Sequence, residues 1–173
     1  VQLAHREKAT LFMALQAAFA GVLNRLCNQD DILIGTPVAN RKLADWETML
    51  GFFANTVVIR NQFHQGTEPL NFRELLKRTR QKVLGALANQ DTPFEKIVEA
   101  LVTKRDLSHS PVFQAMFTFF KGGSNDLEIP GIATEWQSLD LGTAKFDLSL
   151  ELEHREADVH GALEYDTNRC MNL

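Results

Sequence analysis

The chain of 173 residues is long enough for one sizeable domain, and its 45% hydrophobic and 23% charged residues are ordinary for a globular protein. The formal net charge of −4 gives no support to nucleic-acid binding, and the apolar stretches are too short or too interrupted to cross a bilayer. The distant Cys27 and Cys170 suggest ordinary thiols of a reducing compartment, and the five scattered histidines have no metal-ligand spacing. We therefore expect a cytoplasmic protein without a bound metal.

The first half of the chain is predicted to hold a helix and two strands. Apolar residues at helical spacing predict a helix from about Ala9 to Leu26. Ile32–Ile34 is typical of a short buried strand, and Gly35-Thr36-Pro37 is expected to lead out of it because Pro37 excludes a continued central ladder. Residues 40–47 are expected to form a loop anchored by Trp46. A strand then runs from Gly51 to about Phe63.

This strand carries few polar side chains on either face, which is typical of a central, buried strand. Asn55 shares one face with Phe53, Val57 and Ile59. A buried amide must find hydrogen-bond partners or cost roughly 1–3 kcal/mol. Asn55 is therefore either a satisfied structural amide or part of a site that handles a polar substrate.

Two helices are predicted in the middle of the chain. Asn71 and Glu74 form a capping box, with Leu70 and Leu75 as a hydrophobic staple, for a helix that reaches Asn89. A second, short helix starts with Thr92 as N-cap, Pro93 at the first helical position and Glu95 three residues after the cap. It is expected to end near Val102 and to bury the apolar side chains of Phe94, Ile97, Val98 and Leu101.

The last third is predicted to be mainly β-structure. Residues 112–120 form an aromatic-rich strand, and a long loop region follows over 122–144. Alternating apolar residues over 146–153 and 159–165 predict two half-buried strands, joined as an antiparallel hairpin. The order of elements indicates an α/β fold, with a mixed β-sheet and helices packed on it. Phosphate-loop, dinucleotide and serine-elbow motifs are absent from the sequence.

Four segments in series resemble the later motifs of the condensation domain of nonribosomal peptide synthetases. They are Ile34-Gly35-Thr36-Pro37-Val38-Ala39-Asn40-Arg41, Gly51-Phe52-Phe53-Ala54-Asn55-Thr56 with Arg60, Gln90-Asp91-Thr92-Pro93-Phe94-Glu95, and Arg105-Asp106-Leu107-Ser108-His109-Ser110-Pro111. The segments from Lys145 to Leu150 and from Leu163 to Asp166 are similar to the family's closing strands. The resemblance covers nearly the whole chain.

The resemblance implies one lobe of a two-lobed fold similar to chloramphenicol acetyltransferase, with a substrate tunnel between the lobes. In the family, the amine of one carrier-bound substrate attacks the thioester of another, and the catalytic His-His-x-x-x-Asp-Gly motif lies in the first lobe. No two histidines of this chain are adjacent. Residues 1–173 are therefore expected to be the C-terminal lobe, truncated at both ends, without catalytic residues of its own and inactive alone.

The resemblance also assigns roles to individual residues. Asn55, with Gly51 and Thr56, would line and position the substrate tunnel, and Gly51 would allow close approach of backbone or substrate. Gly35, Thr36, Pro37, Asn40 and Arg41 would form the floor loop between the lobes, and part of 122–144 the latch that crosses over. Structural motif positions would be Pro93, Phe94, Glu95, Arg105, Asp106 and Asp147.

The expected partners are the N-terminal lobe and the donor and acceptor carrier proteins, which bring phosphopantetheine; no cofactor is expected on this chain. An isolated lobe would expose its tunnel wall, so self-association is also expected. Two alternatives stay open. One is another branch of the superfamily, an epimerisation, cyclisation or carrier-independent acyltransferase domain. The other is a platform that binds a carrier or partner protein without chemistry.

Overall fold

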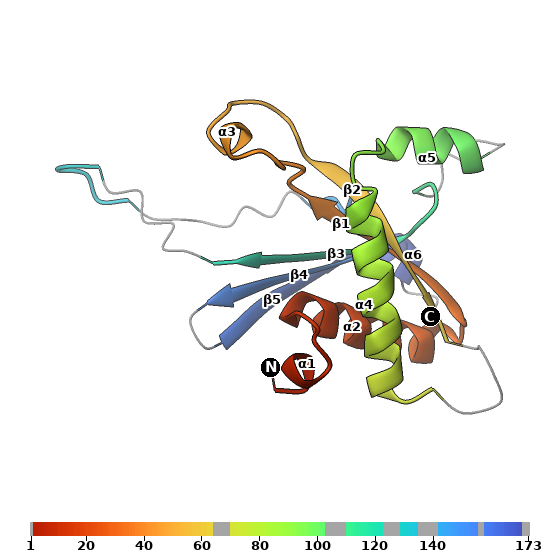
Figure 1. Cartoon of the computed structure of the whole chain (residues 1–173). Coiled ribbons are helices and arrows are strands. Elements are labelled where there is room, and N and C mark those ends of the chain that lie inside the picture. Colours follow the sequence, from red (N-terminus) through yellow and green to blue (C-terminus); the bar gives the residue numbers. More distant parts are fainter. Residues whose placement is uncertain are drawn as a thin grey trace.

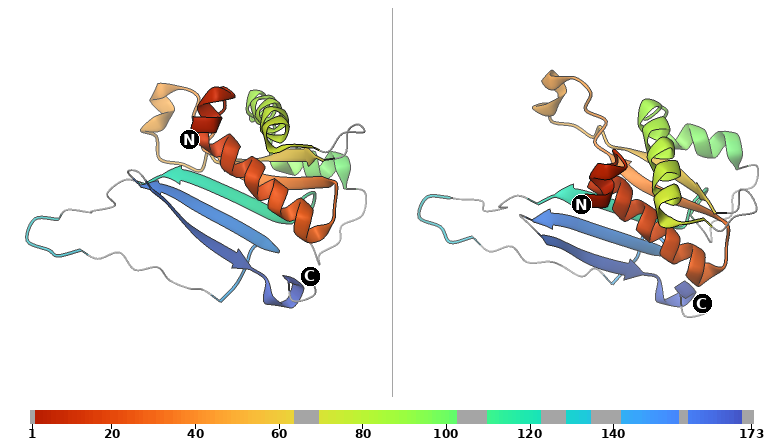
Figure 2. Two further views of the ribbon diagram at one scale, coloured as in Figure 1. Left: turned by 90° about the horizontal axis from the view of Figure 1, so that it is seen from below. Right: turned by 60° about the horizontal axis from the view of Figure 1, so that its bottom comes forward.

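The structure, a computed structural model, describes residues 2–63, 70–102, 110–122, 129–134, 142–155 and 158–170. Its centre is a five-stranded sheet in the order β2-β1-β3-β4-β5, with α2 and α4 on one face (Figures 1 and 2). The strands are β1 (Asp31–Val38), β2 (Asn55–Gln62), β3 (Ala115–Lys121), β4 (Leu148–Arg155) and β5 (Asp158–Tyr165). The helices are α1 (Gln2–Arg6), α2 (Leu11–Cys27), α3 (Ala44–Glu47), α4 (Phe72–Ala88), α5 (Phe94–Leu101) and α6 (Thr167–Cys170).

The sheet is mixed, as predicted. β1 pairs with β2 antiparallel and with β3 parallel, β3 pairs with β4 parallel, and β4 pairs with β5 antiparallel. The predicted hairpin of the two last strands is thereby confirmed, with Leu150 opposite Leu163. The short helices α1 and α3 were not predicted, because neither carries a long periodic apolar pattern. None of the helices in the described ranges is long and apolar enough to cross a membrane.

Helix α2 begins and ends with local signals. The Thr10 hydroxyl caps it by accepting a hydrogen bond from the Met13 N–H at 3.2 Å, and Asn28 ends it in the left-handed conformation with φ 50°. Its buried side chains include Phe19 and Leu23, which pack on β1 and β3. Each large apolar side chain buried in this way contributes roughly 1.5–3 kcal/mol.

Helix α4 packs beside α2 and covers β2. The side-chain oxygen of Asn71 accepts a hydrogen bond from the Glu74 N–H at 3.0 Å, which confirms the predicted N-cap. Leu76 and Val83 are buried against the side chains of Val57 and Ile59 on β2. The two main clusters of buried apolar side chains thus lie between the sheet and this helix layer.

The predicted central position of the strand around Asn55 is wrong. β2 begins at Asn55 rather than Gly51 and lies at the edge of the described sheet, with β1 as its neighbour. The strand is apolar on both faces because α4 covers Val57 and Ile59, while α5 contacts the strand as well. Helices that shield an edge strand produce the same sequence pattern as a central position, so periodicity alone could not separate them.

The predicted end of the first strand is also wrong. β1 continues through Gly35, Thr36 and Pro37 to Val38, and Pro37 pairs with Thr56. The pairing of β1 with β3 is confined to Ile34 and Gly35. At Pro37 only β2 remains as a neighbour, and the missing N–H of a proline is tolerated at such an edge position.

Two predicted faces are less buried within this chain than expected. Helix α5 buries no side chain fully: Phe94, Ile97 and Val98 are half-buried, and Leu101 is 66% exposed. Every residue of β5 is exposed, including Leu163 and Tyr165, because β5 is the outermost strand and α2 does not reach over it. In the long region after β3, residues 129–134 form a small exposed turn that stands away from the sheet (Figures 1 and 2).

Candidate functional site

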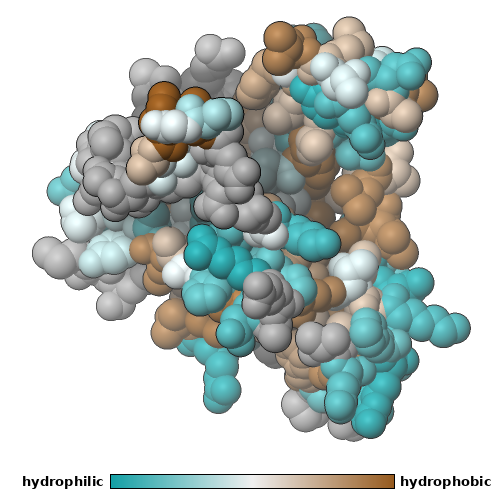
Figure 3. Space-filling model, turned by 90° about the vertical axis from the view of Figure 1, so that its left-hand side faces the viewer, coloured by the Kyte–Doolittle hydropathy of each residue, from teal (hydrophilic) through white to brown (hydrophobic). Residues whose placement is uncertain are grey.

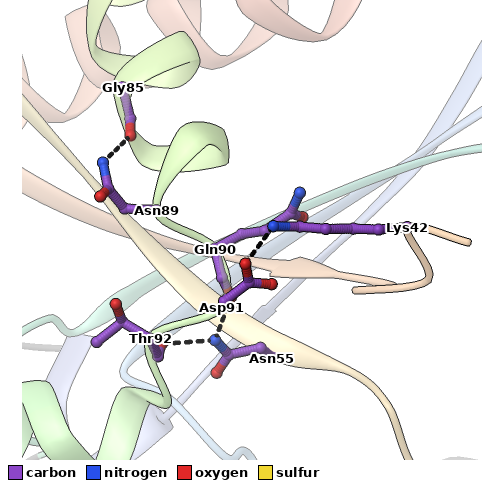
Figure 4. Close-up of polar contacts among 7 residues, drawn as sticks. All are labelled: Lys42, Asn55, Gly85, Asn89, Gln90, Asp91 and Thr92. Carbon is purple, nitrogen blue, oxygen red and sulfur yellow. Dashed lines mark hydrogen bonds and ion pairs between the residues drawn. The ribbon is translucent and has the colours of Figure 1, made fainter.

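The first residue of β2, Asn55, holds the turn between α4 and α5. Its amide nitrogen donates two hydrogen bonds, to the carbonyls of Gln90 and Thr92, each at 2.7 Å (Figure 4). Its amide oxygen accepts a third from the N–H of Phe94 at 3.1 Å. Both donors of the amide are used, and all three partners belong to the backbone.

This arrangement changes how α5 begins. Thr92 was predicted as the N-cap, but the cap position is Pro93 and no side chain of α5's own sequence caps the helix. The Asn55 amide, 39 residues earlier in the chain, accepts from the free N–H of Phe94 instead. A helix start needs such an acceptor, and here a neighbouring strand supplies it.

The end of α4 is fixed locally, so the turn enters the site in a defined direction. The Asn89 side chain donates to the Gly85 carbonyl at 2.9 Å, and the Thr92 N–H donates to the Asn89 carbonyl at 3.1 Å. Asp91, between them, makes an ion pair with Lys42 (Figure 4). Because the two side chains are 67% and 38% exposed, this ion pair contributes little stability.

Arg41 organises the segment that connects β1 to β2. Its guanidinium donates to the carbonyls of Trp46, of Met49 at 2.9 Å and of Gly51 at 3.2 Å. It also lies over the Phe53 ring, 4.3 Å from the ring centroid. One side chain thus ties residues 41–53 into a closed loop, which we call the Arg41 loop. The predicted anchor Trp46 is half-buried and contacts Phe53.

Gly51 has a backbone conformation that other residues rarely adopt. Its φ is +153°, and a β carbon placed there would come within 3.1 Å of the Phe53 ring. The tip of the Arg41 loop is apolar and points to solvent: Leu50 is fully exposed and Phe52 is 94% exposed. On the face that Figure 3 shows, hydrophobic side chains lie at several places, including the top of the view.

The predicted floor residues do not form one loop. Gly35, Thr36 and Pro37 belong to β1, whereas Arg41 begins the Arg41 loop and Asn40 directly precedes it. Asn40 has a φ of +52°, and its buried side-chain oxygen accepts no hydrogen bond from the described residues. Thr56, next to Asn55, is half-buried and lies opposite Pro37.

Behind β1, aromatic rings connect the motif segments. Phe94 contacts Phe113, and Phe113 contacts Phe146, with ring centroids 5.4 Å apart in both pairs. Glu95 is exposed, and the half-buried Asp147 accepts a hydrogen bond through its carbonyl from the Asp166 N–H at 3.1 Å. Arg105 and Asp106 lie outside the described residues.

The clearest perturbed carboxylates lie away from Asn55. Arg60 donates to Asp31 at 2.6 to 3.0 Å, and these hydrogen bonds lower the pKa of Asp31. Asp31 is at the opposite end of the β1–β2 ladder from Asn55. Likewise, a hydrogen bond from Arg155, on the same strand, lowers the pKa of Glu153 on β4. The described histidines lie on α1, β4 and β5, outside the elements that form the site.

The motif residues that the structure describes hold one corner of the fold in place and do not form a catalytic cluster. We call the corner formed by Asn55, the α4–α5 turn and the Arg41 loop the Asn55 corner. Asn55 fixes the α4–α5 turn, Lys42 reaches the same turn, and Arg41 closes the adjoining loop. Sequence reasoning singled out Asn55 and Arg41 but found neither the backbone partners of Asn55 nor the Lys42–Asp91 pair. Those contacts join positions 35 to 49 residues apart, for which a single sequence contains no local signal.

The fold is the chloramphenicol-acetyltransferase-like fold of condensation domains, seen here as one mixed sheet with its helices. The sequence model of the Condensation domain family matches residues 1–169, and the chain belongs to that family, which is found in nonribosomal peptide synthetases.

Among curated proteins, the chain is 43% identical to malpinin synthetase of Mortierella alpina and 41% identical to tyrocidine synthase 3 of Brevibacillus parabrevis. Each match covers 96% of this chain and 2% of the relative's length. Among solved structures, it is similar to the X-domain from teicoplanin biosynthesis, with a TM-score of 0.83 and 28% identity. That match covers 98% of this chain and 40% of the X-domain chain. The same domain in complex with OxyB gives a TM-score of 0.80 and 29% identity over 98% of this chain and 39% of that one.

Proposed function

We propose that this chain is the C-terminal lobe of a condensation domain that forms an amide bond between a donor thioester and an acceptor amine on two carrier proteins. The observation that carries the proposal is that three of the family motifs meet at one corner, braced by Asn55 and Arg41. The match to about two fifths of the X-domain chain supports the assignment to a single lobe.

In this proposal the lobe positions substrates and leaves proton transfer to the other lobe. Aminolysis of a thioester needs an oriented amine, a proton acceptor and stabilisation of a developing oxyanion. A positioned, rigid wall lowers the barrier by fixing the reacting groups near each other. Asn55 would act indirectly, because both of its donors hold the backbone of the α4–α5 turn. Gly51, Thr56 and the residues of the Arg41 loop would shape the adjoining wall and floor.

The exposed tip of the Arg41 loop forms an apolar surface that the other lobe of the domain would cover. Leu50 and Phe52 are almost entirely exposed, which is costly for large apolar side chains in water. We propose that they contact the N-terminal lobe, and that the isolated chain self-associates through them. Sedimentation velocity should show association of the wild-type chain and a monomer for the Leu50→Ser/Phe52→Ser variant. A wild-type monomer at high concentration would contradict this part of the proposal.

The proposed function is tested by reconstitution. The chain, a two-lobed domain that includes it, and the two-lobed domain with its histidine motif replaced by alanine are each incubated with loaded donor and acceptor carrier proteins. Amide product is measured by mass spectrometry of the acceptor. We expect product only from the two-lobed domain whose histidine motif is intact. Amide formation by the isolated chain at a comparable rate would refute the proposal that this lobe depends on the other.

A second candidate, a binding platform without chemistry, is favoured by one comparison. The X-domain of teicoplanin biosynthesis, to which this chain is 29% identical, has been solved in complex with OxyB. If the two-lobed protein around this chain lacks the histidine pair, makes no amide and still retains a partner in a pull-down with purified loaded carriers, the platform replaces condensation as its function. Product formation that depends on the histidine pair excludes it.

A further inference from the structure

A polar pocket of about 150 Å³ lies between β2 and α4, at the opposite end of β2 from Asn55. It lies on the outer side of the sheet edge and shares no residue with the Asn55 corner. Its polar lining includes three cations, three side-chain amides and one hydroxyl: Arg60, Arg78, Lys82, Asn61, Gln62, Gln81 and Thr79.

The floor of the pocket is fixed by hydrogen bonds among buried groups. The Asn61 side chain is buried and donates to the Ile59 carbonyl at 3.2 Å, while its oxygen accepts from the Thr79 hydroxyl at 3.3 Å. These two side chains are satisfied by each other and by backbone. The floor is therefore pre-formed, and a ligand would meet it without having to order it first.

The cations of the pocket outnumber the carboxylates that neutralise them. Arg60 is held by Asp31, and the Arg78 Nε donates to a Glu74 carboxylate oxygen at 3.2 Å. Lys82 lies about one helical turn after Arg78 and makes no direct ion pair with the residues that the structure describes. Asp31, which holds Arg60, also interacts electrostatically with Lys82. The pocket thus has three cations against two neighbouring carboxylates, Asp31 and Glu74.

Arg78 also has a nitrogen that the fold does not satisfy. Its Nη1 is buried and has no hydrogen-bond acceptor among the described residues, although the side chain as a whole is 27% exposed. A buried donor of a charged group without an acceptor is costly, and an acceptor in the pocket would remove that cost once the Arg78 side chain turned Nη1 toward it. A guanidinium is also suited to binding the planar edge of an oxyanion through two parallel N–H groups.

We propose that this pocket binds a small oxyanion, with the Arg78 guanidinium and the Lys82 ammonium as its ligands. A phosphate ester and a carboxylate would present the same acceptor oxygens, and both are small enough for the cavity. The site lies outside the proposed amide-forming corner, so its occupancy is independent of the proposed function. Binding would tie α4 to the edge strand, since the ligands lie on α4 while the floor includes β2.

The test measures the melting temperature of the 173-residue chain against rising concentrations of inorganic phosphate, with sodium chloride keeping the ionic strength constant. A ligand that binds the folded state raises the melting temperature in a saturable way. We expect a saturable rise for the wild type. Arg78→Gln and Lys82→Gln should each weaken the apparent affinity about tenfold or more, the range expected for a lost hydrogen bond to a charged group. Lys96→Gln, which removes an exposed cation from α5, should behave as wild type.

A parallel series with acetate separates the two sources of the ligand chemistry. Saturable protection by phosphate alone assigns the site to phosphate groups, and protection by acetate as well assigns it to oxyanions including carboxylates; both results support the proposal. If Arg78→Gln does not fold, the exposed Lys82 decides the outcome. The proposal is overturned if the melting temperature follows ionic strength only, or if Lys82→Gln responds to phosphate as the wild type does.

Discussion

The ring of Phe113 lies directly against the backbone of Gly35, so that a β carbon at Gly35 would come within 2.3 Å of two ring carbons. Phe113 is fully buried and connects Phe94 to Phe146. The smallest residue of β1 thus makes room for the ring that joins α5 to the segment before β4. Gly35 is needed for space rather than for a special backbone angle.

The first prediction follows from that contact. Gly35→Ala should destabilise the chain by roughly 1–3 kcal/mol, because the buried ring must shift out of a packed position. Urea unfolding followed by circular dichroism measures the change. Gly85→Ala is the matched control: nothing lies within 4 Å of the new methyl group, and alanine in a helix interior should stabilise by roughly 0.5–1 kcal/mol. Equal effects of the two substitutions would contradict the packing argument.

The second prediction concerns Asn55. Asn55→Ala removes three hydrogen bonds to partly exposed backbone groups and should lower the free energy of unfolding by roughly 1–2 kcal/mol. Hydrogen exchange of the Phe94 amide should accelerate more than that of the α2 core. Asn89→Ala, whose amide bonds only within its own helix, should leave the Phe94 amide unchanged.

In a two-lobed domain, Asn55→Ala should also reduce amide formation, because the α4–α5 turn loses its anchor. Activity and stability are measured on the same preparation at a temperature where the variant remains folded. Unchanged turnover with a natural acceptor, together with faster exchange at Phe94, would restrict Asn55 to a structural role.

Arg41 carries the third prediction. Arg41→Lys keeps the positive charge but loses the planar fork that reaches several carbonyls at once. Hydrogen exchange over residues 43–53 should therefore rise several-fold while global stability changes by less than about 1 kcal/mol. Arg25→Lys, an exposed position on α2, serves as control. Protection of 43–53 at the wild-type level would show that the guanidinium does not hold the loop.

Gln16 gives a prediction of the opposite sign. Its side chain is completely buried in α2, and neither its nitrogen nor its oxygen has a hydrogen-bond partner in the part of the chain that the structure describes. Gln16→Leu should stabilise the chain by roughly 1–3 kcal/mol, since an unsatisfied buried amide is removed at similar volume. Gln16→Glu should destabilise it strongly at neutral pH. Thermal unfolding of both variants checks the pair, and a loss of stability in Gln16→Leu would indicate a hidden partner for the amide.

The fifth prediction is a pH dependence. Hydrogen bonds from Arg60 lower the pKa of Asp31 below its ordinary value of 3.8. A carboxyl whose pKa is lower in the folded state adds stability above its unfolded pKa, and that stability is lost as the pH falls through the folded pKa. Acid unfolding curves of wild type and Asp31→Asn should therefore differ above about pH 4 and converge below the folded pKa. The difference should be small and should shrink in salt, because both side chains are about half exposed.

The elements that the sequence predicted best are those with local causes. Thr10 and Asn71 cap α2 and α4, and the alternation in the last two strands gives the hairpin in its correct pairing. The edge position of β2 and the exposure of β5 depend on which helices cover which strand, and no periodicity encodes that. For Asn55, the sequence indicated that the amide needs hydrogen-bond partners but did not identify them. The partners are main-chain groups of a turn 35 to 39 residues later in the chain.

The bonding of Asn55 to carbonyls and an N–H has a consequence for how this corner tolerates sequence change. Side chains at Gln90 and Thr92 are not what the amide recognises, so substitutions there leave its three contacts available. Adding or deleting one residue between α4 and α5 moves the two acceptor carbonyls and the donor N–H of Phe94 out of register with the amide. The corner is thus permissive to the identity of the turn residues and strict about their number, a pattern that a saturation library of substitutions and single-residue insertions over 89–93 would reveal directly.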